Sequence, residues 1–308
     1  MKEIVLTVLA GGTGSAKLVR GLARTMSEDI TVIVNIGDNI KMHGLYICPD
    51  IDTILYTLSD QLNSYQGWGV KNDTYYFLDQ ISKYGEDDWF KLGDKDLALH
   101  IVRTNLLKAG RTLSEATSIL ADRMNISQTV LPASDQHIET RIDTPQGEMH
   151  LQEFWVMLKG EPEVVGVKYG NSKNSRPAPN VVNAILEAEK VIVCPANPVS
   201  SIGPMTDIAG IRKVLTSVRE RVVAVSPIVG TSAVSGPACK FLRSLGVEVS
   251  SKGVASLYSS FVSRLIIDGS DKAMIADIEQ LGVKVSVTDI VMRTEKDEQR
   301  LAKFVTGV

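Results

Sequence analysis

The stretch VLAGGTGSAKL near the N-terminus constrains the fold more than any other part of the sequence. In it an apolar run is followed by Gly11, Gly12 and Gly14, and then by a segment with helical spacing. Glycines between a strand and a helix let the backbone approach a ligand closely, and the first turn of the helix offers free N–H groups to an anion. Thr13 and Lys17 add a hydroxyl and a positive charge. The stretch predicts a phosphate-binding loop, for which a tight turn without a ligand is the simpler alternative.

This loop fits neither of two familiar phosphate-binding motifs. A dinucleotide-binding loop reads G-x-G-x-x-G and is followed by an acidic residue after the second strand, but here Lys17 replaces the third glycine and Asn35 the acid. A Walker loop needs a glycine before its lysine and a hydroxyl residue after it, and both are missing. The sequence therefore argues against a nicotinamide enzyme and an ordinary ATPase, while the loop still favours an anion.

Strand and helix patterns alternate at both ends of the chain. EIVLTVL (3–9) and ITVIVNIGDN (30–39) predict buried strands joined by a helix, and similar pairs recur after residue 184. The middle shows helical patterns and an alternating stretch around a Pro-Gln-Gly turn. We expect an α/β fold, a Rossmann-like and mostly parallel sheet flanked by helices, with a helical plus β-hairpin insertion. Its core would come from 1–58 and 185–308, and the inserted region, 59–184, would cover the edge where such sheets bind ligands.

Composition narrows the classes of partner. Lys plus Arg number 33 and Asp plus Glu 36, a net charge of −3, which argues against a nucleic-acid partner. The longest uncharged stretch is broken by prolines and glycines, so no membrane partner is expected. Cys48, Cys194 and Cys239 are far apart and form no metal or redox spacing, which is typical of a reduced, cytoplasmic protein.

Acidic residues gather at the start of a predicted helix, in CPDIDTILY. Asp50 and Asp52 could share a divalent cation or activate a hydroxyl, and the simpler alternative is that one of them caps the helix. Asn35 and Asp38 follow the neighbouring strand, so they are expected to reach the same crevice.

A second polar group lies in KLGDKDLALHIVRT. Lys91 precedes a glycine and is expected on a loop, whereas Asp96, His100 and Arg103 share one helical face. This face is either a solvated charged surface or a second wall of the site, where Lys91 and Arg103 would meet anionic oxygens.

Two loops of the second half, CPANPVSSIGP and SPIVGTSAVSGPACK, follow buried strands and are rich in Pro, Gly and Ser. Small and hydroxyl-bearing residues in both loops suit phosphate and ribose, and an amide suits a base or a hydroxyl. The candidate nucleotide-binding residues are Asn197, Ser200, Ser201, Gly203, Ser226, Gly230, Ser235 and Gly236. Trp68, Trp89 and Trp155 are expected in the core or at the rim, with stacking on a flat ring as the alternative.

Taken in order, GGTGSAKL, NIGDN, PDIDTILY, WGVKNDT, KLGDKDLALHIVRTN, SIGP and VVAVSPIVGTSAVSGPA resemble the 2-phospho-L-lactate transferase family of coenzyme F420 biosynthesis. The resemblance implies a Rossmann-like core with an insertion. It also implies transfer of a phospholactyl or phosphoenolpyruvyl group from a guanosine diphosphate ester to the deazaflavin FO, with release of GMP and a requirement for Mg²⁺. The motifs do not distinguish the two three-carbon acids, and we expect a homodimer only because most oligomers are dimers.

The resemblance also implies roles for single residues. Asp52 and Lys91 would contact FO, and Asp50, Asp52 and Lys91 would be the catalytic residues. Asp50 and Asp52 would hold Mg²⁺ or orient the attacking hydroxyl, and Lys17 in the glycine loop would hold the transferred phosphate. The loops of the second half would hold the guanosine. Lys95 and Ala196 depart from the usual pattern of arginine and serine, which weakens the expectation at the guanosine end.

The alternative function is a regulatory, nucleotide-sugar-binding protein of the gluconeogenesis-factor branch, which shares the glycine loop. The PDIDT stretch favours the transferase, because that branch carries a different sequence there.

Overall fold

The computed structural model describes residues 5–26 and 29–307. Its centre is a sheet of seven parallel strands in the order β14-β13-β10-β9-β1-β2-β5. The strands are β1 (Leu6–Ala10), β2 (Ile30–Val34), β5 (Thr129–Pro132), β9 (Lys190–Val193), β10 (Val222–Val225), β13 (Arg264–Ile267) and β14 (Lys284–Val287). β1 and β10 are fully buried and β9 is buried after Lys190, as expected for a parallel sheet with helices on both faces. The start of the predicted first strand, Glu3 and Ile4, lies outside the described residues.

The strand order reverses between β1 and β9, and this places the site. From β1 the chain moves to β2 on one side, and it later returns to β9 on the other side. Because such crossovers are right-handed, the helices that connect consecutive strands on the two sides of β1 fall on opposite faces, whereas α12 (Glu295–Thr306), which follows the last strand, returns to the face of α1 (Gly12–Thr25). On one face α1 packs against α2 (Pro49–Leu58) and α12; in the other half α6 (Val181–Glu187) packs against α8 (Ile211–Ser217). The expected Rossmann-like class is confirmed.

The predicted boundary of the insertion is wrong at one element. β5 lies within 59–184, yet it pairs with β2 as the edge strand of the main sheet, and α5 (Leu113–Arg123) packs against it. In β5 only Val130 and Leu131 form an apolar run, between Thr129 and Pro132, and this run is too short to mark a buried strand, which explains the error. The rest of the segment lies outside the sheet and includes α3 (Tyr76–Lys83) and α4 (Asp94–Lys108).

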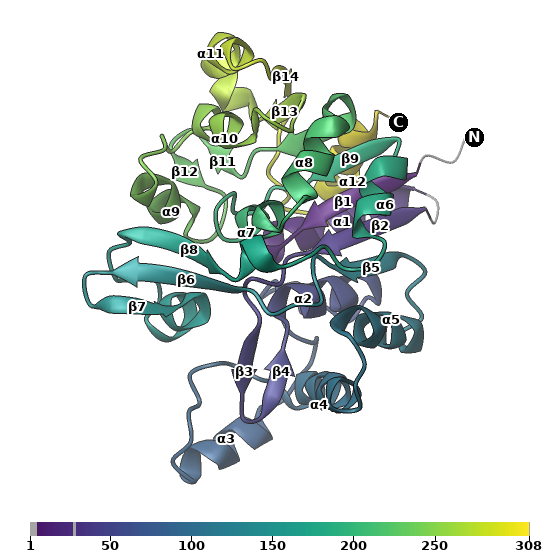
Figure 1. The fold of residues 1–308 in the computed structure, drawn as a ribbon, viewed down its shortest axis with the longest axis vertical. Helices are drawn as coiled ribbons and strands as arrows, with labels where there is room; N and C mark the ends of the chain where they lie inside the picture. The colour runs from purple at the N-terminus through teal and green to yellow at the C-terminus, as the bar shows by residue number, and fades with distance from the viewer. Residues whose placement is uncertain (1–4, 27–28, 308) are drawn as a thin grey trace.

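Two hairpins extend from this framework. The predicted one is confirmed: β6 (Glu139–Thr144) pairs with β7 (Gly147–His150), and β8 (Gly166–Gly170) completes a three-stranded sheet. After β7 the chain does not continue as a strand but forms a π-helix, η1 (Glu153–Met157). The hairpin of β3 (Ile40–Met42) and β4 (Leu45–Ile47) was not predicted; its turn uses His43 and Gly44 at positive φ. In Figure 1 it extends below the main sheet with α3 and α4.

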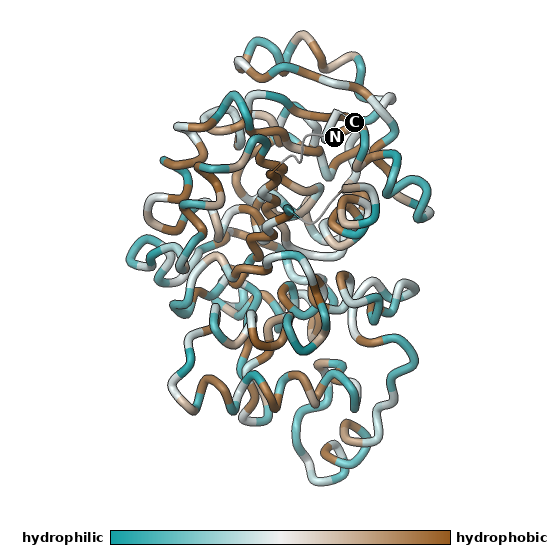
Figure 2. Tube along the Cα trace, turned by 90° about the vertical axis from the view of Figure 1, so that its right-hand side faces the viewer, coloured by the Kyte–Doolittle hydropathy of each residue, from teal (hydrophilic) through white to brown (hydrophobic). Residues whose placement is uncertain are grey.

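The remaining elements lie between the strands of the second half of the chain. They are α7 (Ile202–Asp207), β11 (Ile228–Val229), β12 (Ser232–Ala233), α9 (Ala238–Ser244), α10 (Ser251–Tyr258) and α11 (Ile275–Gln280), with short 3-10 turns between some of them. Figure 2 shows apolar stretches gathered in the middle of the molecule and polar loops around it. In the described ranges no helix has the length and apolarity needed to cross a bilayer.

Candidate functional site

A pocket of about 460 Å³ opens where β1, β9 and β10 end, at the point where the strand order reverses. Its walls come from the glycine loop, the start of α2, the loops after β9 and β10, the π-helix η1 and the segment before α12. Segments from both halves of the chain therefore meet at the place where open α/β sheets bind ligands.

The glycine loop is held so tightly against its neighbours that side chains would not fit. A Cβ at Gly14 would lie 2.4 Å from the carbonyl oxygen of Pro195, and one at Gly11 would lie 2.8 Å from Cβ of Ser201. Gly12 adopts a φ of +72°, which favours glycine. The first turn of α1 contains no acidic residue. Asp50 accepts the N–H of Gly12, and the other N–H groups of this turn are left for a ligand anion. This geometry suits a phosphate.

Lys17 lines the same pocket and is held in place. Its Nζ donates a hydrogen bond to the carbonyl oxygen of Met292 at 2.9 Å. An ammonium group has three donors, so at least one further donor is available for a phosphate oxygen.

Asn35 is fully buried at the end of β2 and joins the two carboxylates that line the pocket. Its Nδ2 donates to Oδ1 of Asp38 and Oδ2 of Asp50, each at 2.9 Å, and Oδ1 of Asp50 also accepts the N–H of Gly12 at 2.7 Å. Burial raises the pKa of Asp50 to about 6, although these two hydrogen bonds lower it. Burial and the charge of Asp50 raise the pKa of Asp38 well above its ordinary value. The three residues therefore lie together as expected, but Asn35 bonds the two carboxylates from behind and is not among the described residues that line the pocket.

Asp50 and Asp52 do not face the same side of α2. Residues two apart on a helix point about 200° away from each other, whereas residues three apart share a face. Asp50 and Thr53 accordingly line the pocket. Asp52 lies buried against Arg103, whose Nη1 donates to Oδ2 at 3.1 Å and whose Nη2 donates to Oδ1. The structure therefore corrects the expectation that both aspartates meet one ligand, because Asp52 is not among the described residues that line the pocket.

The predicted helical face of Asp96, His100 and Arg103 exists on α4, but it is buried and faces α2. The hydroxyl of Tyr56 donates to Oδ1 of Asp96 at 2.5 Å, and His100 lies between Asp96 at 3.1 Å and Asp52 at 3.5 Å. Burial lowers the pKa of Arg103, whereas the charge of Asp52 and the hydrogen bonds to it raise the pKa. The upward effects together are larger, so the pKa lies above its ordinary value. The face is neither a solvated surface nor a contact for anions; it is an ion-pair cluster that joins α2 to α4.

Three other expected site residues lie away from the pocket. Lys91 is exposed on the segment before α4. Lys91, Gly203 and Gly230 are all missing from the described residues that line the pocket. Gly203 allows α7 to pack on β8, because a Cβ there would lie 2.0 Å from the hydroxyl oxygen of Tyr169. Gly230 turns the β11–β12 hairpin at a φ of +60°, and its N–H donates to Asp271 at 2.8 Å. These contacts correct the predicted ligand contacts of the two glycines, which serve packing and turn geometry.

Asn197, Ser201 and Ser226 do line the pocket, as predicted. Oδ1 of Asn197 accepts the backbone N–H groups of Val199 and Ser200 at 3.0 and 3.2 Å, which fixes the amide. Nδ2 of Asn197 is buried and has no hydrogen-bond partner among the described residues. A buried amide donor normally has a partner, so this atom suits a ligand oxygen.

The sequence did not identify part of the wall. Ile290 and Met292 line the pocket from the segment before α12, and no local motif marks them. Trp68 and Trp155 also line it and are 38% and 41% exposed. Stacking on a flat ring was the alternative considered for all three tryptophans, and the sequence did not distinguish among them. In the structure the third, Trp89, packs edge-to-face on Phe90.

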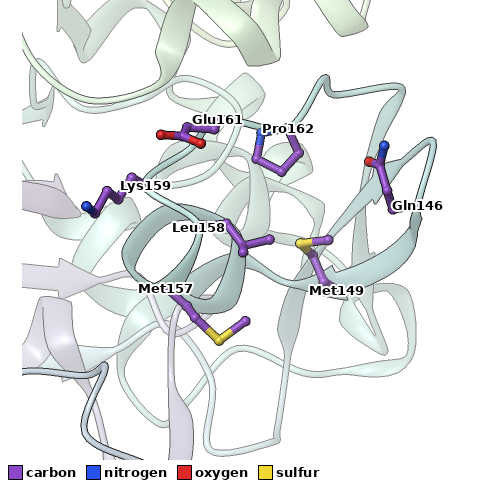
Figure 3. A pocket seen from close by; sticks show the side chains of 7 residues that line it. All are labelled: Gln146, Met149, Met157, Leu158, Lys159, Glu161 and Pro162. Carbon is purple, nitrogen blue, oxygen red and sulfur yellow. The ribbon is translucent and has the colours of Figure 1, made fainter.

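A second and larger hollow, of about 660 Å³, lies beyond the π-helix η1 (Figure 3). It is lined by Gln146, Met149, Met157, Leu158, Lys159, Glu161 and Pro162, and Figure 3 shows Met149 and Leu158 turned toward one another. It shares no described lining residue with the pocket at the sheet edge and lies off that edge. Size alone therefore does not make it the candidate site.

Comparison with known proteins places this geometry in context. The family described as 2-phospho-L-lactate transferase CofD matches residues 6–304. The chain is 41% identical over 306 residues to the 2-phospho-L-lactate transferase of Methanocaldococcus jannaschii, covering 98% of this chain and 97% of that protein. It is 40% identical over 294 residues to the phosphoenolpyruvate transferase of Streptomyces avermitilis, covering 93% and 92%.

A solved structure is similar in fold. A member of the upf0052 family from Bacillus halodurans superimposes with a TM-score of 0.69 over 99% of both chains. At 16% sequence identity this likeness shows the shared fold alone.

Proposed function

The chain belongs to the 2-phospho-L-lactate transferase CofD family, and from this premise we propose that it transfers a 2-phospho-L-lactate or phosphoenolpyruvate group to the deazaflavin FO in coenzyme F420 biosynthesis. The donor is a guanosine diphosphate ester, and GMP is released. The observation that carries this proposal is the pocket at the reversal of strand order, where an anion-binding helix start lies beside Asp50. The comparisons give the alternative, a nucleotide-sugar-binding regulator, no separate support.

The reaction is a phosphoryl transfer. The terminal ribityl hydroxyl of FO forms a bond to the phosphorus that carries the three-carbon acid, the bond from that phosphorus to the bridging oxygen breaks, and GMP leaves with that oxygen. Positioning and charge neutralisation account for most catalysis of this kind. The N-terminus of α1 and Lys17 would bind the phosphoryl oxygens, and Asp50, which lines the pocket beside that helix start, would orient the hydroxyl and accept its proton.

The residues present fit a magnesium ion, but not the predicted pair. Mg²⁺ is usually held by one or two carboxylates together with water and substrate phosphates. Asp38 and Asp50 both line the pocket and both have raised pKa values, so a cation between them would relieve the unfavourable burial of two negative charges. Asp52 is already neutralised by Arg103. We therefore assign Asp38 and Asp50 as the residues that would hold Mg²⁺, which when bound would offset charge on the phosphoryl oxygens.

The test is a transfer assay with the purified protein, FO and Mg²⁺, supplied in parallel with the lactyl and the enolpyruvyl guanosine diphosphate esters. Mass analysis of the deazaflavin product identifies the acid that is transferred. Asp50→Asn is expected to reduce turnover by at least about 100-fold, because a positioned proton acceptor contributes about 100- to 10,000-fold. Asp79→Asn, at an exposed position on α3, is the matched control and should leave turnover unchanged. If folded wild-type protein gave no product with either ester, the proposed function would be refuted.

A further inference from the structure

Trp155 is a large aromatic side chain left 41% exposed on the wall of the pocket. We propose that it is the stacking platform for a flat, fused heteroaromatic ring, an inference that rests on the proposed function. Both substrates of that reaction carry such a ring, the guanine of the donor and the deazaflavin of the acceptor. The shared chemistry is a planar aromatic face, which aromatic side chains bind by stacking.

The backbone beneath Trp155 is unusual and well anchored. The residue belongs to the π-helix η1, and π-helical turns are rare and often occur at functional sites. The preceding side chain, Phe154, is fully buried and packs against Phe241 of α9 at 5.7 Å between ring centroids. One residue is therefore fixed in the core while its neighbour is directed to the pocket wall.

Gly160 supports the indole ring from one side. A Cβ at this position would lie 2.8 Å from Cε3 and 2.9 Å from Cζ3 of Trp155, so only glycine allows the ring to lie where it does. Gly160 also has a φ of +65°, which favours glycine for a second reason.

Lys240 fixes this support to α9. Its Nζ donates to the carbonyl oxygen of Gly160, to that of Glu161 at 3.0 Å and to that of Pro162 at 3.3 Å. A lysine that binds three consecutive carbonyls holds the turn after η1 in one place. Trp155 is therefore held in position before any ligand binds, which reduces the entropy lost on stacking.

The experiment measures the Kd values of GMP and FO by calorimetry for the wild-type protein and for Trp155→Ala, Trp155→Phe and Trp89→Ala. We expect Trp155→Ala to weaken binding of one of the two compounds by about 10- to 100-fold, the range for loss of one aromatic stacking partner. The compound affected identifies the ring that stacks. Trp155→Phe should recover most of the affinity, and Trp89→Ala, at a position that is not among the described lining residues, should leave both Kd values unchanged.

A structural role is tested by a further variant and by stability. Gly160→Ala is expected to displace the ring and weaken the same compound as Trp155→Ala. The melting temperature of Trp155→Ala should stay close to that of the wild type, because the side chain is partly exposed.

Unchanged Kd values for both compounds in Trp155→Ala would refute the stacking platform and leave the proposed function intact. If the wild-type protein bound neither compound, the platform would also be refuted, and the transfer assay would decide the proposed function separately.

Discussion

Removing the charge of Arg103 is the strongest test of how the site is built. The Arg103 side chain is 0% exposed, and it binds both carboxylate oxygens of Asp52, which is 6% exposed. Arg103→Met keeps most of the volume but leaves Asp52 buried without its partner. Breaking a buried ion pair in this way costs about 3–5 kcal/mol, because the remaining charge is uncompensated. For a chain of 308 residues, at about 2.1 cal/mol/K of unfolding entropy per residue, this corresponds to a decrease in melting temperature of about 5–8 °C.

A double-mutant cycle isolates the pair. Asp52→Asn should destabilise by a similar amount, because it leaves Arg103 unpaired, and the double variant should cost clearly less than the sum of the two single variants. The assay is urea unfolding at pH 7, followed by circular dichroism. Additive effects of the two changes would refute the ion pair and would return Asp52 to the list of residues free to meet a ligand.

Two further predictions follow from the pocket. Gly14→Ala should lower the melting temperature and weaken GMP binding, because the new Cβ would meet the carbonyl oxygen of Pro195; a variant with wild-type stability and affinity would contradict this contact. Burial raises the folded-state pKa of Asp50 to about 6, above its unfolded value, so the folded protein binds this proton more tightly. Without metal, its contribution to the free energy of unfolding should therefore fall by about 2 kcal/mol as the pH rises from 4 to 7, and Asp50→Asn should lack this decrease in melting curves. Parallel pH profiles for the two proteins would argue against the shift.

The sequence predicts the parallel framework because most of its strands are apolar runs that are followed directly by glycine-containing or polar loops. The loop after β1, Asp38 after β2, and Asn197 and Ser226 after β9 and β10 reach one pocket for a topological reason. The carboxyl ends of parallel strands share an edge, and the strand order reverses between β1 and β9. Any polar residue placed directly after these strands was therefore predictable as a candidate.

What the sequence could not give depends on contacts between distant segments. β5 was assigned to the insertion because Thr129 and Pro132 leave it an apolar run of only two residues, and only pairing with β2 reveals its place. Gly203 and Gly230 resembled ligand-binding glycines, but one makes room for Tyr169 and the other turns a hairpin. Ile290 and Met292 reach the pocket from almost the end of the chain, beyond the reach of any local motif.

The pair Asp50 and Asp52 shows how one fact of helix geometry separates two roles that the sequence had merged. Once Pro49 starts α2, positions 50 and 53 share one side, and positions 52 and 56 share another. The first side faces the glycine loop, so Asp50 accepts the N–H of Gly12 and stays available to a ligand. The second faces α4, where Asp52 and Tyr56 meet the cluster around Arg103.

Asp52 therefore fixes the helix that presents Asp50, and a loss of activity on changing Asp52 would not by itself show contact with substrate. Comparing the activity of Asp52→Asn with that of Arg103→Met distinguishes the two cases: equal losses indicate positioning, and a larger loss for Asp52→Asn indicates direct contact.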